Sequence, residues 1–228
     1  MTAGRLSDRM LRENAGVLAE MVGHRFVQDI RLGRLPPEVF DRYLGIEGAF
    51  VDTAIAIFAL ATAKAGAIAT RRRLIAVLDA LANEQVAYFE RVLAARGIPE
   101  GGAAPDTSGV AEFRNGMLRI AQAGSYADIA TAMFAAEWMY WTWCRGIDPA
   151  GIADAHLRDW VALHAEPGFE AQARWLKDEV DREGGALDGA AQDRLVRLFG
   201  EVQRLEIAFH EAAYASPGAA QAGHGERR

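Results

Sequence analysis

The chain has 228 residues, which is more than one average domain but not clearly two. Its net charge of -6 argues against nucleic acid as the main partner, because a phosphate backbone needs a basic surface. The single cysteine, Cys144, excludes an internal disulfide and fits a reducing compartment. No apolar leader or membrane span stands out, so we expect a cytoplasmic protein without a membrane partner.

Helical patterns then follow one another along the chain. Apolar residues recur at helical spacing from Glu38, just after Pro36-Pro37, and no breaker appears before Gly66. A second long helix is expected from about Thr70 to Ala95, with Gly97 as its C-cap. A Gly- and Pro-rich loop is expected over 99–109. Further helices are predicted over about 110–123, 126–145, 156–163, 169–183 and 189–214, the second of them capped by Ser125 and Asp128.

The pattern as a whole predicts an all-α protein. No alternating run of β-branched residues, internal repeat or interdomain linker is found, so residues 1–215 are predicted to form one helical domain. The Gly- and Ala-rich, polar tail over 216–228 is predicted to be disordered. Long amphipathic helices of this kind form a bundle, and we expect the functional side chains to point into its interior.

Three glutamates interrupt otherwise apolar helical segments. Glu47 lies between Ile46 and Phe50, while Glu137 and Glu206 lie in equally apolar surroundings. A carboxylate taken out of water is costly and its pKa tends to rise, which suits general acid and base chemistry. The alternative is that each glutamate lies on a solvated helix face.

Other features also allow two interpretations. Trp138, Trp141 and Trp143 can fill the core or line a site, and Cys144 is by default a small buried hydrophobe. Glu206 and His210 are four residues apart and could share a metal ion, with further ligands from Glu47, Glu84 and His164. A di-iron bundle needs several such carboxylate and histidine sets, so no metal or cofactor is predicted.

The spacing of several motifs resembles the TenA/thiaminase II family, whose members have the haem-oxygenase-like all-α fold and act in thiamin breakdown and pyrimidine salvage. The resemblance covers roughly residues 5–215. It is carried by the segments His24-Arg25-Phe26-Val27-Gln28, Gly33-Arg34-Leu35-Pro36 with Phe40 and Tyr43, Gly124-Ser125, Ala136 to Tyr140, Trp160 with His164, and Leu205 to Tyr214.

The resemblance implies roles for residues of this chain. Glu206 falls on the family's catalytic glutamate, and Glu47 on an aspartate that binds the aminopyrimidine. Phe50, Phe113, Tyr140 and His164 fall on positions that line the substrate pocket. Ala136 falls on the nucleophilic cysteine, as in the part of the family that lacks this cysteine and is thought to rely on carboxylates. Glu137 could then bring a water to the ring.

The predicted function is therefore hydrolysis of a thiamin-derived aminopyrimidine in a central pocket, with a pyrimidine or related heterocycle as partner. The resemblance also implies a homotetramer. Two alternatives stay open: a ligand-binding or regulatory protein without chemistry, and a metal-dependent oxygenase on the related helical fold.

Overall fold

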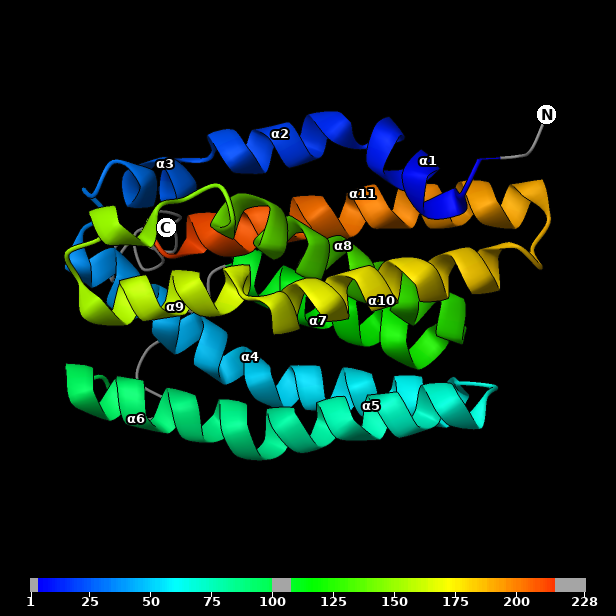
Figure 1. Ribbon diagram of the computed structural model, residues 1–228, viewed down its shortest axis with the longest axis horizontal. Helices are drawn as coiled ribbons and strands as arrows, with labels where there is room; N and C mark the ends of the chain where they lie inside the picture. Colours follow the sequence, from blue (N-terminus) through cyan, green and yellow to red (C-terminus); the bar gives the residue numbers. More distant parts are fainter. Residues whose placement is uncertain (1–3, 100–107, 216–228) are drawn as a thin grey trace, which may run out of the picture.

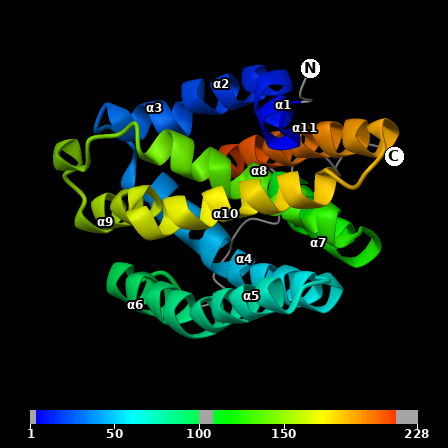
Figure 2. The same ribbon diagram turned by 45° about the vertical axis from the view of Figure 1, so that its right-hand side comes forward.

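A computed structural model describes residues 4–99 and 108–215. Within these ranges the protein consists of eleven α-helices, a short π-helical segment and one 3-10 turn, without a strand, so the predicted all-α class is confirmed. Helices α1 to α3 run along one side of the molecule and the α5–α6 pair along the opposite side, with α8 and α11 between them (Figure 1 and Figure 2).

The N-terminal side consists of three short helices: α1 (Leu6–Glu13), α2 (Ala15–Gly23) and α3 (Arg25–Arg31). The imidazole of His24 caps α3 by accepting a hydrogen bond from the backbone N–H of Phe26 at 3.2 Å. Met10, Met21 and Phe26 are completely buried, so this side anchors itself to the core by one large side chain from each helix.

Helix α4 (Pro37–Lys64) is the helix predicted from Glu38, and it begins at the proline pair because a proline in the first turn loses no intrahelical hydrogen bond. Of the described helices, it is the one long and apolar enough to cross a membrane by length and composition. It packs against α5 and α7, and half of its most apolar window is buried inside the bundle, as in a core helix.

The long helix predicted over 70–95 is divided in the structure. Helix α5 (Ile68–Ala80) passes through a π-helical segment, η1 (Leu81–Gln85), into α6 (Val86–Arg96), and Gly97 follows in the left-handed conformation with φ 68°. A π segment inserts one extra residue per turn and is frequent at functional sites. None of the residues of η1 is buried, so its side chains are available to a cavity or to solvent.

The predicted loop over 99–109 falls mostly outside the described residues, but its last two residues are wrongly placed. Ser108 and Gly109 begin α7 (Ser108–Ala123). A glycine is required at position 109 because α11 passes very close: an added Cβ would lie 2.5 Å from the carbonyl oxygen of Ala208. The predicted disordered tail, 216–228, also lies outside the described residues.

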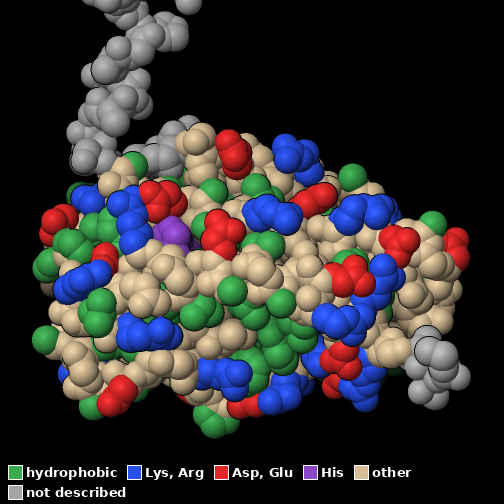
Figure 3. Space-filling model, turned by 90° about the horizontal axis from the view of Figure 1, so that it is seen from above, with side chains coloured by type: hydrophobic (Ala, Val, Ile, Leu, Met, Phe, Trp, Pro, Cys, Tyr) green, Lys and Arg blue, Asp and Glu red, His purple; other side chains and the backbone are tan. Residues whose placement is uncertain are grey.

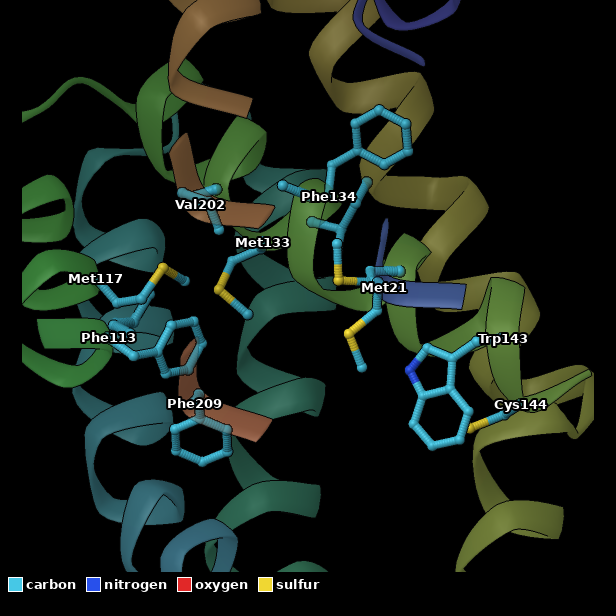
Figure 4. Packing of buried hydrophobic residues seen from close by; sticks show 14 of the residues in the cluster. Met21, Phe113, Met117, Met133, Phe134, Trp143, Cys144, Val202 and Phe209 are labelled. Atoms are coloured by element: carbon cyan, nitrogen blue, oxygen red, sulfur yellow. The ribbon is translucent and has the colours of Figure 1, made fainter. Parts of the chain in front are cut away.

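Helix α8 (Tyr126–Cys144) is the centre of the bundle. Its residues are buried at 15 of 19 positions, which confirms the prediction of a helix buried on most sides. It packs against α10 (Pro167–Gly184), α11 (Gly189–Ala212) and, more loosely, α9 (Ala155–Ala165), which follows the 3-10 turn Pro149–Gly151. Trp143 and Cys144 lie in its packed core (Figure 4).

Charged side chains of both signs are interspersed over the face shown in Figure 3, without a large basic area. Arg71, Arg72 and Arg73 are all exposed on α5, as predicted for this short basic run. This face therefore does not have the basic area that binding of a phosphate backbone needs.

The capping box at the start of α8 gives the first prediction. Ser125 accepts from the backbone N–H of Asp128, and Asp128 accepts from that of Ser125. We expect Ser125→Ala to lower the free energy of unfolding by about 1 kcal/mol in urea titrations. Ser125→Thr keeps the hydroxyl and serves as the control. Equal stability of Ser125→Ala and wild type would contradict the assigned role of this cap.

Candidate functional site

A cavity of about 650 Å³ lies between α4, the α5–α6 pair, α7, α8, α11 and the turn from α9 to α10. It brings together all seven residues predicted from the sequence as site residues. They reach it from five helices: Glu47, Phe50, Phe113, Glu137, Tyr140, His164 and Glu206. Ala136 also faces it.

Aromatic rings form one wall of the cavity. The ring of Phe113 lies 4.8 Å from that of Phe50 and 4.9 Å from that of Phe209. Figure 4 shows Phe113, Met117 and Phe209 grouped opposite Met133, and all four line the cavity. Such a wall suits a flat ring. Phe209 was not predicted as a site residue, although its position three residues after Glu206 places both on neighbouring faces of α11.

Glu47 is held at the inner end of the cavity by α9. The indole N–H of Trp160 donates a hydrogen bond to Glu47 Oε2 at 2.7 Å, and His164 Nε2 lies 3.8 Å from Glu47 Oε1. Burial raises the pKa of Glu47 to about 8, although the Trp160 donor and the nearby Tyr43 hydroxyl partly offset this rise. The carboxyl is therefore mostly protonated at neutral pH.

His164 presents a neutral imidazole beside Glu47. Its Nδ1 donates to the backbone carbonyl of Trp160 at 2.8 Å, so Nε2 carries the lone pair. Burial lowers the pKa of His164 to about 4. The ring stacks on that of Tyr140, with centroids 5.3 Å apart. The site therefore offers an acceptor nitrogen next to a carboxylic acid.

Glu206 reaches the cavity from α11 and is only 1% exposed. Burial raises its pKa to about 8; the adjacent Tyr140 hydroxyl lowers it and the charge of Glu47 raises it further. Its Oε2 has no hydrogen-bond partner. A buried carboxyl with a pKa near neutrality and a free oxygen can both give and accept a proton.

Tyr43 lies behind Glu47 and was not predicted as a site residue. Its hydroxyl is 2.6 Å from that of Tyr140, and its ring is fully buried. The sequence signal for it is the spacing of four residues from Tyr43 to Glu47, which places both on one face of α4. Tyr43 therefore contacts the tyrosine carried by α8 from the face of α4 that also carries Glu47.

Glu137 belongs to a separate polar cluster of the cavity. Burial raises its pKa to about 8, while the neighbouring Gln172 amide and the charge of Arg73 lower it. Arg73 donates to Gln172 at 3.2 Å and lies over the ring of Trp175 at 4.8 Å. Neither Glu47 nor Glu206 alters the pKa of Glu137. We call Glu47 and Glu206 the inner pair of carboxyls of the cavity and Glu137 the outer one.

The residues of the metal hypothesis do not form a ligand set. His210 Nδ1 donates to the backbone carbonyl of Glu206 at 2.8 Å, and His210 does not line the cavity. Glu84 is exposed on the π segment. Among the described residues, no three His, Cys, Asp or Glu side chains are grouped in a way that could hold an ion. The ring of His210 stacks on that of Tyr43, with centroids 5.2 Å apart.

Cys144 is buried and does not line the cavity, as predicted for a small core residue. Burial raises the pKa of its thiol well above the usual value, which disfavours the thiolate. Ala136 has no reactive atom. Among the side chains of the cavity itself, the groups able to move protons are therefore carboxyls, tyrosine hydroxyls and an imidazole.

Comparison with known proteins identifies the family to which the chain belongs. The sequence model of the TENA/THI-4/PQQC family matches residues 13–216, and the chain belongs to this family. A relative described as an aminopyrimidine aminohydrolase, from Halalkalibacterium halodurans, is 27% identical over 197 residues, which cover 84% of this chain and 87% of the relative.

Solved structures show the same fold. A TenA homologue from Pyrococcus furiosus superposes with a TM-score of 0.84 at 19% identity, covering 92% of this chain and 100% of the other. A TenA homologue from P. horikoshii OT3 gives a TM-score of 0.83 at 20% identity, covering 92% and 99%. The predicted haem-oxygenase-like helical fold is therefore confirmed.

The buried carboxyls predict how stability depends on pH. The pKa of Glu206 is about 8 in the folded chain against 4.5 for an ordinary glutamate, so the folded state holds more protons between these values. The free energy of unfolding should then decrease as the pH rises through this window, by at most about 1.4 kcal/mol per pH unit for each group. The buried histidines act oppositely, but only below their ordinary pKa of 6.5.

We therefore expect stability to fall from pH 6.5 to 9 in wild type and to fall less steeply in Glu206→Gln. The measurement is urea unfolding at several pH values. Glu90→Gln, at an exposed position on α6, should keep the wild-type slope. Equal slopes in wild type and Glu206→Gln would show that Glu206 is not held as an acid.

Proposed function

We propose that the protein hydrolyses a thiamin-derived aminopyrimidine, replacing an amino or substituted amino group by hydroxyl without a cysteine nucleophile. The observation that carries the proposal is the pairing of Glu47 and Glu206 on one aromatic-walled cavity, with both pKa values near 8. Membership of the family and the relative described as an aminopyrimidine aminohydrolase support the same reaction class.

Recognition of the ring follows from the inner end of the cavity. An aminopyrimidine presents a ring nitrogen that accepts a hydrogen bond beside an exocyclic amine that donates one. A protonated Glu47 donates to the first and accepts from the second, and two parallel hydrogen bonds fix the orientation of the ring. Phe50, Phe113 and Tyr140 provide faces for stacking, and His164 Nε2 is a further acceptor next to Glu47.

The chemistry is assigned to the other two carboxyls. Glu206 acts as general base toward a water and as general acid toward the leaving nitrogen, so that the water oxygen bonds to carbon while the C–N bond breaks. Glu137, one residue after Ala136, holds the water on the side of the ring where a thiolate would otherwise attack. Each carboxyl is suited to this work because burial keeps its pKa near the working pH.

A second candidate is a binding protein without chemistry, and one observation favours it: Ala136 supplies no nucleophile at the position where the family has its cysteine. Tight binding of an aminopyrimidine without any turnover would support this second function and contradict the first.

We also infer a cytoplasmic homotetramer, as the family resemblance implies. Light scattering on the purified protein should give four times the chain mass of 24.7 kDa. A monomer or dimer at micromolar concentration would contradict the inference.

Kinetics on thiamin and on 4-amino-5-aminomethyl-2-methylpyrimidine test the proposed reaction. Glu206→Gln should lower kcat by about 10²- to 10⁴-fold, because it removes the proton-transfer group. Glu47→Gln should chiefly raise KM, by about tenfold or more, because an amide cannot match both positions of the ring edge as the carboxyl does.

Glu201→Gln, at an exposed position of the same helix as Glu206, is the matched control and should behave as wild type. No turnover of either compound by wild type, or Glu206→Gln indistinguishable from wild type, would contradict the proposed hydrolysis.

A further inference from the structure

His164 carries a nitrogen lone pair at the inner end of the cavity. Its Nδ1 donates to the backbone carbonyl of Trp160 at 2.8 Å, so in the neutral ring Nε2 is the acceptor. Nε2 lies 3.8 Å from Glu47 Oε1, which is too long for a hydrogen bond. Within the residues that the structure describes, no group donates to Nε2, although His164 lines the cavity.

Aromatic neighbours fix the direction of this lone pair. The centroid of the imidazole is 4.2 Å from that of Trp160, 5.3 Å from that of Tyr140 and 5.0 Å from that of Phe169. His164 is only 7% exposed. Turning the ring over would also break the hydrogen bond that Nδ1 donates. Nε2 is therefore a preorganised acceptor, and a ligand need not spend binding energy to orient it.

Glu47 is fixed by the same helix that carries His164. Its Oε2 accepts from the indole N–H of Trp160 at 2.7 Å, and Trp160 lies one helical turn before His164 on α9. Trp160 is completely buried. One rigid element thus sets the separation between the carboxyl of α4 and the imidazole of α9.

A primary exocyclic amine on a flat heterocycle has two N–H groups in the plane of the ring. One N–H lies on the side of the neighbouring ring nitrogen, and the proposed contact with Glu47 uses this one. The other N–H points to the opposite side of the amine. It needs an acceptor of its own, because a donor that is buried without a partner weakens binding.

The gap between Glu47 Oε1 and His164 Nε2 fits one amine nitrogen. Hydrogen bonds of this kind are about 2.9 Å long, so a nitrogen at that distance from both atoms spans their separation of 3.8 Å. Both atoms belong to residues that line the cavity. The carboxyl and the imidazole can therefore accept from the two N–H groups of the same amine.

We propose that His164 is a specificity-determining residue, which accepts the second N–H of a primary exocyclic amine while Glu47 takes the first N–H and the adjacent ring nitrogen. The inference rests on the proposed function and narrows its substrate class to heterocycles with an unsubstituted amine beside a ring nitrogen. An oxo group would place a second acceptor against the lone pair of Nε2. An N-methylamino group would either place its methyl there or lose the N–H that faces Glu47.

Calorimetry with two ligands tests the assignment. They are 4-amino-5-hydroxymethyl-2-methylpyrimidine and its derivative with a methylamino group in place of the amine. Wild type should bind the primary amine at least tenfold more tightly, because the derivative loses one hydrogen bond. His164→Ala removes the acceptor and makes room for the methyl, so this preference should fall below threefold or reverse. His164→Gln, whose amide oxygen can take the place of Nε2, should keep most of it.

His156→Gln is the matched control, because it changes another histidine of α9 that does not line the cavity. It should keep the wild-type preference, and circular dichroism checks that each variant is folded. Equal affinity of wild type for the two ligands, or an unchanged preference in folded His164→Ala, would overturn the assignment.

Nitrogen NMR on ¹⁵N-labelled wild type gives a readout that needs no variant. The Nε2 resonance of His164, assigned by correlation with its own backbone, should move upfield when the primary amine binds, because an accepted hydrogen bond shields an unprotonated ring nitrogen. The methylamino derivative should leave it almost in place. An Nε2 resonance that does not respond to the bound primary amine would overturn the assignment, even if His164→Ala failed to fold.

These measurements follow binding and involve no turnover, so the two proposals can fail separately. Wild type that binds with the expected preference but turns nothing over would contradict the hydrolysis and support the role of His164. Wild type that hydrolyses the substrate but binds the two ligands equally would contradict the role of His164 and leave the hydrolysis standing. Absence of binding of the primary amine would contradict both.

Discussion

Glu47 and Glu206 carry their carboxyls into an interior built from aromatic rings, where no cation is among the groups that set their pKa values. Taking a carboxylate out of water costs several kcal/mol, and a protein commonly meets this cost by keeping the group protonated. The architecture around them follows from this constraint. Trp160 donates a hydrogen bond to Glu47 without providing charge, and burial keeps the pKa values of both carboxyls at about 8.

The helices make such an interior possible because they satisfy their own backbone hydrogen bonds, which leaves only side-chain polar groups to be satisfied inside. Glu47, Tyr140, His164 and Glu206 come from four different helices, and the spacing between those helices fixes their geometry. The outer cluster around Glu137 differs in kind. It includes Arg73 and Gln172, and the π segment contributes Glu84 and Gln85 to the wall of the same cavity. One cavity thus combines an uncharged inner end with a charged outer part.

Much of the fold could be predicted from the sequence, because α4, α8 and α11 combine helical periodicity with clear start signals such as Pro37 and the Ser125 capping box. The π segment could not, since Leu81–Gln85 contains only residue types that an ordinary α-helix accepts. Gly109 was predicted to lie in a loop, although it is helical. The glycine is needed there because α11 passes close by, and such a tertiary contact cannot be seen in the sequence.

The residues of the candidate site were likewise predictable only where the signal lies within one segment of the sequence. The three glutamates were found because charge within apolar segments is visible in sequence, and their cavity positions agree with that interpretation. Tyr43 and Gln172 were missed because their importance depends on neighbours from other helices: Tyr140 across from α4, and Arg73 across from α10. The ligand set of the metal hypothesis is not found among the described residues, because His210 does not line the cavity that holds Glu47 and Glu206.

The central claim is that the inner end of the cavity recognises an aminopyrimidine through Glu47. The most direct measurement is a crystal structure with 4-amino-5-hydroxymethyl-2-methylpyrimidine, the hydrolysis product, at a concentration that calorimetry shows to be saturating. We predict the ring against the wall of Phe50 and Phe113, with its amino group and adjacent ring nitrogen on Glu47 and its hydroxymethyl group toward Glu206. A ligand bound outside this cavity, or bound inside it with the amino edge away from Glu47, would contradict the account.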